Sequence, residues 1–184
     1  MKTADASGRS ARVTLIVNAV LFQIGWFSCV LGAAHDQPWI GPLAAVGIIS
    51  WHLAHAMRPK LELALIAGAV LLGAVFETLL IQTGLVRFST GALIAGTAPS
   101  WMMALWAMFA TTLNVSLRSL RTHPALAMIL GAVSGPLAYF AGARLGALTF
   151  AATGPALIAI GLGWAILTPV LLAAARRFDG YAQP

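Results

Sequence analysis

Residues 63–86 read LALIAGAVLLGAVFETLLIQTGLV, and Glu77 is the one charged side chain in this run. A helix needs about 20 apolar residues to cross the hydrocarbon core of a bilayer. The stretch therefore predicts a transmembrane helix. Glu77 precedes the end of the run by nine residues, which places its backbone about 14 Å deep at the helical rise per residue.

Five other apolar runs have the same character, and with 63–86 they take up most of the chain. The whole sequence is 60% hydrophobic and 9% charged, with a mean hydropathy of +0.89. These values lie outside the range of soluble globular domains. We predict an all-α integral membrane protein, a bundle of six transmembrane helices that forms one polytopic domain over residues 1–184. The other five predicted helices are 13–34, 37–57, 98–117, 125–143 and 154–175.

The Lys and Arg residues are spread unevenly over the breaks between these helices. If the two chain ends share one side of the membrane, nine of the eleven lie on that side. Cytoplasmic loops are enriched in Lys and Arg, so we predict that both termini are cytoplasmic. The nine are Lys2, Arg9, Arg12, Arg58, Lys60, Arg118, Arg121, Arg176 and Arg177, and the other two are Arg87 and Arg144.

Composition also argues against several kinds of partner and cofactor. The basic residues are scattered over short loops and form no patch, so we expect no nucleic-acid partner. Cys29 is the only cysteine, which excludes an internal disulfide or a cysteine metal site, and we expect no cofactor. Residues 13–34 also resemble a signal peptide, but the run exceeds an ordinary signal core. We favour a retained first helix.

Small residues recur at every fourth position of the fifth predicted helix: Ser134, Ala138, Gly142 and Gly146. Such a stripe lets another helix approach closely in a membrane, so we predict that this face packs against a helix, either within the chain or from another membrane protein. Trp101, at the start of the fourth predicted helix, is expected to anchor the chain at the membrane interface.

Glu77 is the clearest candidate for a functional group inside the membrane. Ionisable side chains at this depth are costly and normally face the interior of the bundle or a wet cavity. Arg144, near the outer end of the fifth predicted helix, is its expected partner. Two interpretations stay open: a structural acid, paired or protonated, and a functional acid.

A second polar group is predicted near the cytoplasmic face. His52 and His55 are three residues apart and share a face of a helix, but a zinc site needs three or four ligands, so we predict no metal. Asn114 and Arg118 are expected to contact lipid phosphate. No nucleophile–base pair is evident, so no catalytic residue is assigned and an enzyme is not favoured. The group comprises Asn18, His52, His55, Thr111, Asn114 and Arg118.

Three segments resemble a bacterial family of small polytopic inner-membrane proteins known only as a domain of unknown function. They are FQIGWFSCV (22–30), LWAMFATTLNVSL (105–117) and GPLAYFAGARLG (135–146). The resemblance extends over all six predicted helices and implies a location in the bacterial inner membrane. Genes of that family often lie beside genes for cyclopropane-type fatty-acid modification, which implies a role around membrane lipid. The motifs mark Gln23, Trp26, Asn114, Ser116, Tyr139 and Arg144.

Three functions remain open at this point. The first is a membrane protein that handles lipid or fatty acid, with membrane lipid as its partner. The second is a small-molecule-binding subunit of a transporter, and the third is an intramembrane enzyme that uses Glu77. The candidate ligand-binding or lipid-binding residues are Gln23, Trp26, Glu77, Asn114, Arg118, Tyr139 and Arg144.

Overall fold

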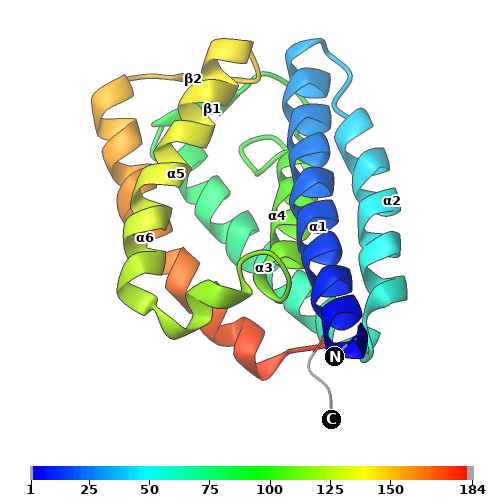
Figure 1. Cartoon of the computed structure of the whole chain (residues 1–184). Helices are drawn as coiled ribbons and strands as arrows, with labels where there is room; N and C mark the ends of the chain where they lie inside the picture. Colours follow the sequence, from blue (N-terminus) through cyan, green and yellow to red (C-terminus); the bar gives the residue numbers. More distant parts are fainter. Residues whose placement is uncertain (1, 182–184) are drawn as a thin grey trace.

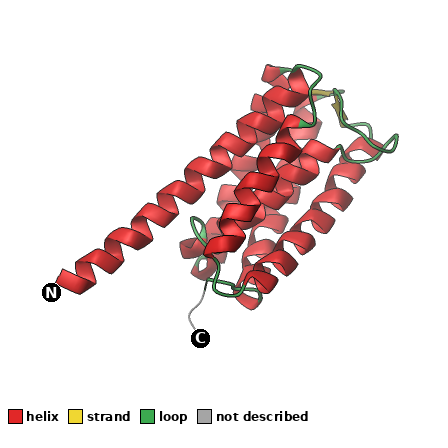
Figure 2. Ribbon diagram, turned by 90° about the vertical axis from the view of Figure 1, so that its right-hand side faces the viewer, coloured by secondary structure: helices red, strands yellow, loops and turns green. Residues whose placement is uncertain are grey.

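In the computed structural model, six α-helices run back and forth between two ends of the molecule (Figure 1). The structure describes residues 2–181 and the side chains of residues 12–181, so the side chains of Lys2 and Arg9 lie outside it. We call the end that holds both termini the inner end and the opposite end the outer end (Figure 2). The helices are α1 (Lys2–Ala34), α2 (Ile40–His55), α3 (Pro59–Gln82), α4 (Ser100–Leu113), α5 (Pro124–Leu145) and α6 (Thr153–Arg177).

Four of these helices are long and apolar enough to cross a membrane: α1 from Arg12, α3, α5 and α6. The all-α prediction is confirmed to this extent. The helices α2 and α4 are apolar but have 16 and 14 residues, or lengths of about 24 and 21 Å. The predicted runs 37–57 and 98–117 were longer because apolar residues continue into the turns on either side of these two helices.

The short helix α4 lies in the middle of the bundle, in contact with α1, α2, α3 and α6. Eleven of its 14 residues are buried. A helix covered by protein on all sides does not have to match the thickness of the lipid. The outward faces of the other helices carry exposed apolar side chains such as Leu71, Leu137 and Ile158. Apolar outer faces of this kind are consistent with a membrane protein.

The closest helix contact joins α5 to α6. A Cβ atom on Gly135 would lie 2.5 Å from the ring of Trp164, and one on Gly131 would overlap Thr168. Glycines at these two positions, outside the predicted stripe, therefore let α5 and α6 approach. The helix α5 ends at Leu145, and Gly146 caps it with a φ of 96°, so the last member of the stripe is outside the helix.

The outer end is closed by a pair of strands that the sequence did not predict, β1 (Val86–Phe88) and β2 (Leu148–Phe150). They pair antiparallel, with Val86 opposite Phe150 (Figure 1). Trp101 is fully buried here, and its indole N–H donates to the carbonyl of Thr90 at 3.0 Å. The expectation that Trp101 anchors the chain at the membrane interface is wrong, because the loop after β1 folds over it.

Candidate functional site

A cavity of about 680 Å³ lies between α1, α4, α5 and α6 in the outer half of the bundle. Its lining comes from residues between 22 and 30 of α1, between 101 and 109 of α4 and between 134 and 145 of α5, together with Leu148 and Trp164. Most of these side chains are aromatic or aliphatic. The size and the apolar walls with few polar groups are typical of sites for organic ligands.

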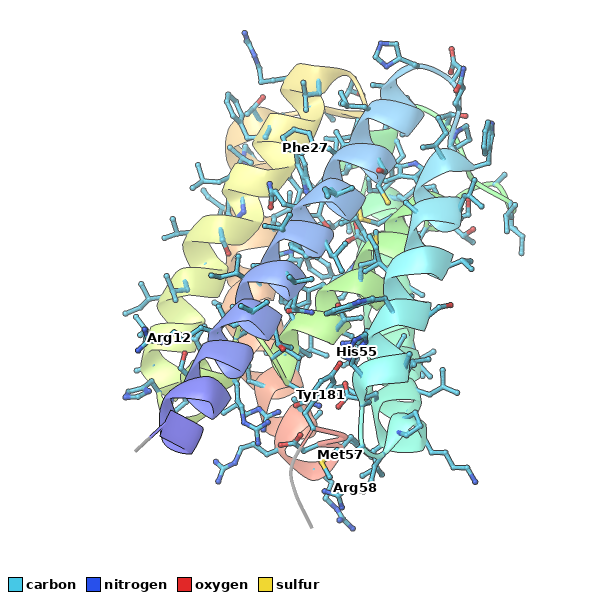
Figure 3. All side chains as sticks on the ribbon, turned by 45° about the vertical axis from the view of Figure 1, so that its right-hand side comes forward. Arg12, Phe27, His55, Met57, Arg58 and Tyr181 are labelled. Atoms are coloured by element: carbon cyan, nitrogen blue, oxygen red, sulfur yellow. The ribbon has the colours of Figure 1, made fainter. Side chains whose placement is uncertain are left out.

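The cavity opens sideways, through the gap between α1 and α5. Residues that line it on both of these helices are also exposed at the surface: Phe27 is 46% exposed and Leu137 62%. Phe27 lies where α1 faces α5 (Figure 3). The opening is therefore on the lateral, apolar face of the bundle and not at one of its ends.

The small residues predicted to pack against a helix line this cavity instead. Ser134, Ala138 and Gly142 all face it, and α1 and α5 touch only sparsely. Small side chains leave space where larger ones would fill the gap between two helices. Three members of the stripe therefore border the cavity, and the packing of another helix on this face stays a prediction.

Glu77, which is fully buried in α3, bonds to two aromatic side chains that line the cavity, Trp106 and Tyr139. We call this part of the lining the rear wall. The indole N–H of Trp106 donates to Glu77 Oε1 at 2.9 Å, and the Tyr139 hydroxyl donates to the same oxygen. Trp106 stacks on Trp164 with ring centroids 4.9 Å apart. The carboxyl group therefore lies behind the wall and fixes it, linking α3 to α4 and α5.

Arg144 does not pair with Glu77, contrary to the sequence-based expectation. It is exposed near the end of α5 and lines the outer part of the cavity. Tyr139 takes its place as the α5 partner of Glu77. The Tyr139 hydroxyl bonds to Oε1 without bringing a second charge into the interior, where charges are costly, and Oε2 has no partner among the described side chains.

Two polar side chains face the cavity from opposite sides. Gln23 of α1 and Ser134 of α5 both line it and both are exposed to it. Within residues 12–181, neither side chain has a hydrogen-bond partner. This is unusual for a serine in a helix, which commonly bonds to the carbonyl four residues earlier, as Ser28 does with Ile24.

The polar residues near the inner end form a separate, buried network around Glu62. Its Oε2 lies 2.8 Å from Nε2 of His52. Its Oε1 accepts from the Asn114 amide at 2.5 Å and from the backbone N–H of Gly180 at 2.7 Å. His52, Glu62 and Asn114 are at most 1% exposed. The network therefore joins α2, α3 and the end of α4 to the residues that follow α6.

Those residues fold back beneath the bundle and close the inner end. The Tyr181 hydroxyl donates to the carbonyl of His52 at 2.7 Å, close to the end of α2 (Figure 3). Burial and the neighbouring Glu62 raise the pKa of Tyr181, so this hydroxyl stays protonated as a donor. Asp179 accepts from Arg118 at 2.9 Å and from Arg121 at 2.8 Å.

Burial alone would raise the pKa of Asp179, but the hydrogen bond from Arg121, the backbone N–H of Tyr181 and the two guanidinium charges together lower it. Asp179 is therefore an ionised partner of the two arginines. Arg118 is bonded to the chain itself, and its contact with lipid phosphate stays a prediction.

The structure divides the predicted site residues between the two regions. Gln23, Trp26, Tyr139 and Arg144 line the cavity, with Glu77 behind it, whereas Asn114 and Arg118 belong to the inner network. Asn18 joins the fourth helix nearby, where its amide donates to the carbonyl of Thr111 and its oxygen accepts from Ser116.

The side chains of His52 and His55 lie in different surroundings: His52 is fully buried and His55 is exposed. His55 bonds to the carbonyl of Trp51 instead. No group of three potential metal ligands among His, Cys, Asp and Glu occurs in the part of the chain that the structure describes. No local pattern pointed to Asp179 or Tyr181, since their partners Arg118, Arg121 and His52 are far away in the chain.

Comparison with known proteins supports the resemblance that the motifs suggested. Residues 15–170 match DUF2878, a protein family of unknown function. The match includes every residue that lines the cavity and stops before the segment that closes the inner end. No curated protein and no solved structure matches the chain. The match covers most of the 184 residues, and the chain belongs to the DUF2878 family.

Proposed function

We propose that this protein crosses the bacterial inner membrane six times with both termini in the cytoplasm, and that it holds the acyl chain of a membrane lipid in the cavity between α1 and α5. The lateral opening is the observation that carries the lipid part of this proposal. A cavity on the lateral face of a membrane protein opens to the hydrocarbon of the bilayer. A lipid chain enters it directly, whereas a water-soluble molecule has to cross apolar surroundings first.

The dimensions of the cavity support the same ligand. From Ser134 to Arg144 the wall on α5 extends over ten residues, or about 15 Å. This is close to half of the hydrocarbon core, which is about 30 Å thick. The cavity therefore matches the depth of one leaflet, and its outer part reaches the level of lipid headgroups.

The distribution of basic residues supports the six-pass topology. Arg12, the turn between α2 and α3, and the region after α4 all lie at the inner end, where α6 also finishes. Arg87 in β1 and Arg144 in α5 lie at the outer end. The inner end is thus the basic one and belongs in the cytoplasm. The short helices α2 and α4 complete their passes with the residues of the turns that flank them.

The topology is tested with reporter fusions. Alkaline phosphatase, which is active only outside the cytoplasm, should be inactive when fused after Arg177 and active when inserted in the loop of residues 89–97. Green fluorescent protein should give the opposite pattern. An active phosphatase after Arg177 overturns the proposed orientation.

Lipid binding is tested by filling the cavity. Ala138 lines it, and Ala138→Phe adds a ring there; Val133→Phe is the matched control, because Val133 is on the outer face of the same helix, 54% exposed. Native mass spectrometry of the protein released from nanodiscs should show bound lipid in the parent and the control, and much less in Ala138→Phe. Equal lipid content in all three contradicts the proposal.

The two other functions have weaker support from the described residues. Glu77 lies behind Trp106 and Tyr139 and is fully buried, which suits a structural acid better than a reacting group. A docking motif of two alanines four residues apart would serve a transporter subunit. Here Ala143 is in α5 but Ala147 is beyond its end, so the pair does not form one helical face.

A further inference from the structure

Gln23 and Ser134 carry more information about the ligand than the apolar walls do. The amide of Gln23 and the hydroxyl of Ser134 face the cavity without a hydrogen-bond partner among residues 12–181. Both residues are near the middle of their helices, and so near the middle of the membrane under the proposed topology. Polar groups left unsatisfied in such surroundings cost free energy. A plain hydrocarbon chain would leave them unsatisfied.

Arg144 supplies a charged group at the cavity. Its side chain lines the outer part and is exposed. A guanidinium group at the level of lipid headgroups binds carboxylate or phosphate through two parallel hydrogen bonds. The cavity therefore has a cationic outer end and an uncharged hydrogen-bonding inner end, separated by an apolar stretch.

We infer that the ligand of this cavity is an acyl chain with an anionic head at Arg144 and an uncharged hydrogen-bonding substituent, such as a hydroxyl or a keto group, at the level of Gln23 and Ser134. This inference rests on the proposed function and names the class of lipid. The two polar levels are about 15 Å apart along α5. An extended chain advances roughly 1.2 Å per covalent bond, as the polypeptide backbone does, so the substituent lies about 12 bonds from the head.

The two inner side chains are complementary to such a group. The Gln23 amide both donates and accepts, and the Ser134 hydroxyl does the same. One hydroxyl on the ligand therefore satisfies a group on each helix and bridges α1 to α5 across the gap, where the two helices otherwise touch only sparsely.

The experiment uses octadecanoate and a series of its derivatives, each with one hydroxyl that is moved stepwise from the carboxyl end to the methyl end. Binding to the full-length protein in nanodiscs is measured by displacement of a brominated octadecanoate, which quenches the fluorescence of the cavity residues Trp26, Trp106 and Trp164. The affinity should peak when the hydroxyl is about 12 bonds from the carboxylate. At the peak it should exceed that of octadecanoate on the order of tenfold, or about 1.4 kcal/mol.

Two sets of variants, each with its own control, locate the polar groups. Gln23→Leu and Ser134→Ala should each remove most of the preference for the hydroxylated chain while octadecanoate still binds. Ser28→Ala is the control, because the Ser28 hydroxyl already bonds to the carbonyl of Ile24. Arg144→Gln should weaken binding of every carboxylate in the series, and Arg87→Gln, which removes an exposed arginine from the same end, should not.

The outcomes separate this inference from the proposal on which it rests. If no octadecanoate displaces the brominated probe, or if Ala138→Phe leaves its quenching unchanged, the cavity does not hold acyl chains and both fail. If octadecanoate and all hydroxylated chains bind equally, the cavity holds acyl chains but Gln23 and Ser134 meet only water. That result overturns the inference alone, as does a preference that survives both Gln23→Leu and Ser134→Ala.

Discussion

The outer cavity and the inner network treat their polar side chains in opposite ways. At the inner end the Glu62 carboxyl group is bonded to His52, Asn114 and the backbone of Gly180. In the cavity, Gln23 and Ser134 have no partner among residues 12–181. Glu62 is buried by protein and the cavity has mostly apolar walls, so an unsatisfied polar group is costly in each.

This difference separates a structural role from a binding role. The inner network bonds most of its polar atoms to one another, with Asn114 Oδ1 and Arg121 Nη2 left over, and it fixes the helices relative to one another. Polar side chains that face an apolar cavity without partners gain a partner only when something enters. We therefore assign stability to the inner network and recognition to the cavity, and the following predictions test that division.

The largest effect is expected from Glu62→Leu. The substitution leaves His52, the Asn114 amide and the Gly180 N–H without their acceptor, and breaking a buried pair of this kind costs about 3–5 kcal/mol. Thermal unfolding in detergent should show a clear loss of stability. Glu62→Gln keeps an acceptor oxygen and should cost much less.

The control for this prediction is Asp36→Asn, which changes an exposed acid in the turn before α2. Asp36 has a φ of 58°, and Asn tolerates this backbone conformation, so its stability should match the parent. If Glu62→Leu unfolds at the parent's temperature, the inner network does not stabilise the fold. The structural role assigned to the network is then wrong.

A smaller effect is expected from Glu77→Leu, because Glu77 has two hydrogen-bond donors to satisfy, on Trp106 and Tyr139. Leaving a buried donor unsatisfied costs about 1–3 kcal/mol. Glu77→Gln retains an acceptor oxygen and should be nearly as stable as the parent. Thermal unfolding and lipid content should be measured together, since Glu77→Leu loosens the rear wall of the cavity.

Three results are distinguishable for Glu77. If Glu77→Leu loses both stability and bound lipid while Glu77→Gln keeps them, Glu77 is a structural acid that fixes the rear wall of the cavity. Stability kept in Gln with loss of the cellular phenotype indicates a functional acid instead. Equal behaviour of both variants and the parent in every measurement contradicts the role given to Glu77 here.

The sequence predicts the helices well because long apolar runs need helical hydrogen bonding in a membrane. It also predicts Glu77 as an interior group, since one carboxyl group stands out in residues 63–86. It fails where pairing depends on distant segments. Nothing local distinguishes Tyr139 from Arg144 as the partner of Glu77, because both are on α5 and the outcome depends on how deep each one lies.

The same limit applies to the stripe of Ser134, Ala138 and Gly142. Small residues every fourth position predict space beside a helix, but they do not tell whether a helix or a cavity fills that space. The strands β1 and β2 went unpredicted for a related reason: three-residue strands have no period to detect, and their paired residues are 60 or more positions apart. The bond from the Ser89 hydroxyl to the carbonyl of Gly146 spans a similar distance.

The smallest effect is expected from the segment that closes the inner end, and it should depend on pH. In the folded chain the pKa of Asp179 is lowered: burial opposes this shift, but the hydrogen bonds and charges of Arg121 and Arg118 outweigh it. A lowered pKa means that Asp179 contributes stability above its unfolded pKa of about 3.9. That contribution is lost as the pH falls through the lower, folded value.

Asp179→Asn should therefore cost about 1 kcal/mol near neutral pH. Its unfolding temperature should begin to approach the parent's below about pH 4 and should match it once the pH is below the folded pKa of Asp179. Arg121 is 8% exposed and Arg118 is 45% exposed, so Arg121→Gln should reproduce the effect more fully than Arg118→Gln, whose charge is screened by water. A difference between Asp179→Asn and the parent that persists unchanged into strong acid would mean that the ion pairs of Asp179 do not hold this segment in place.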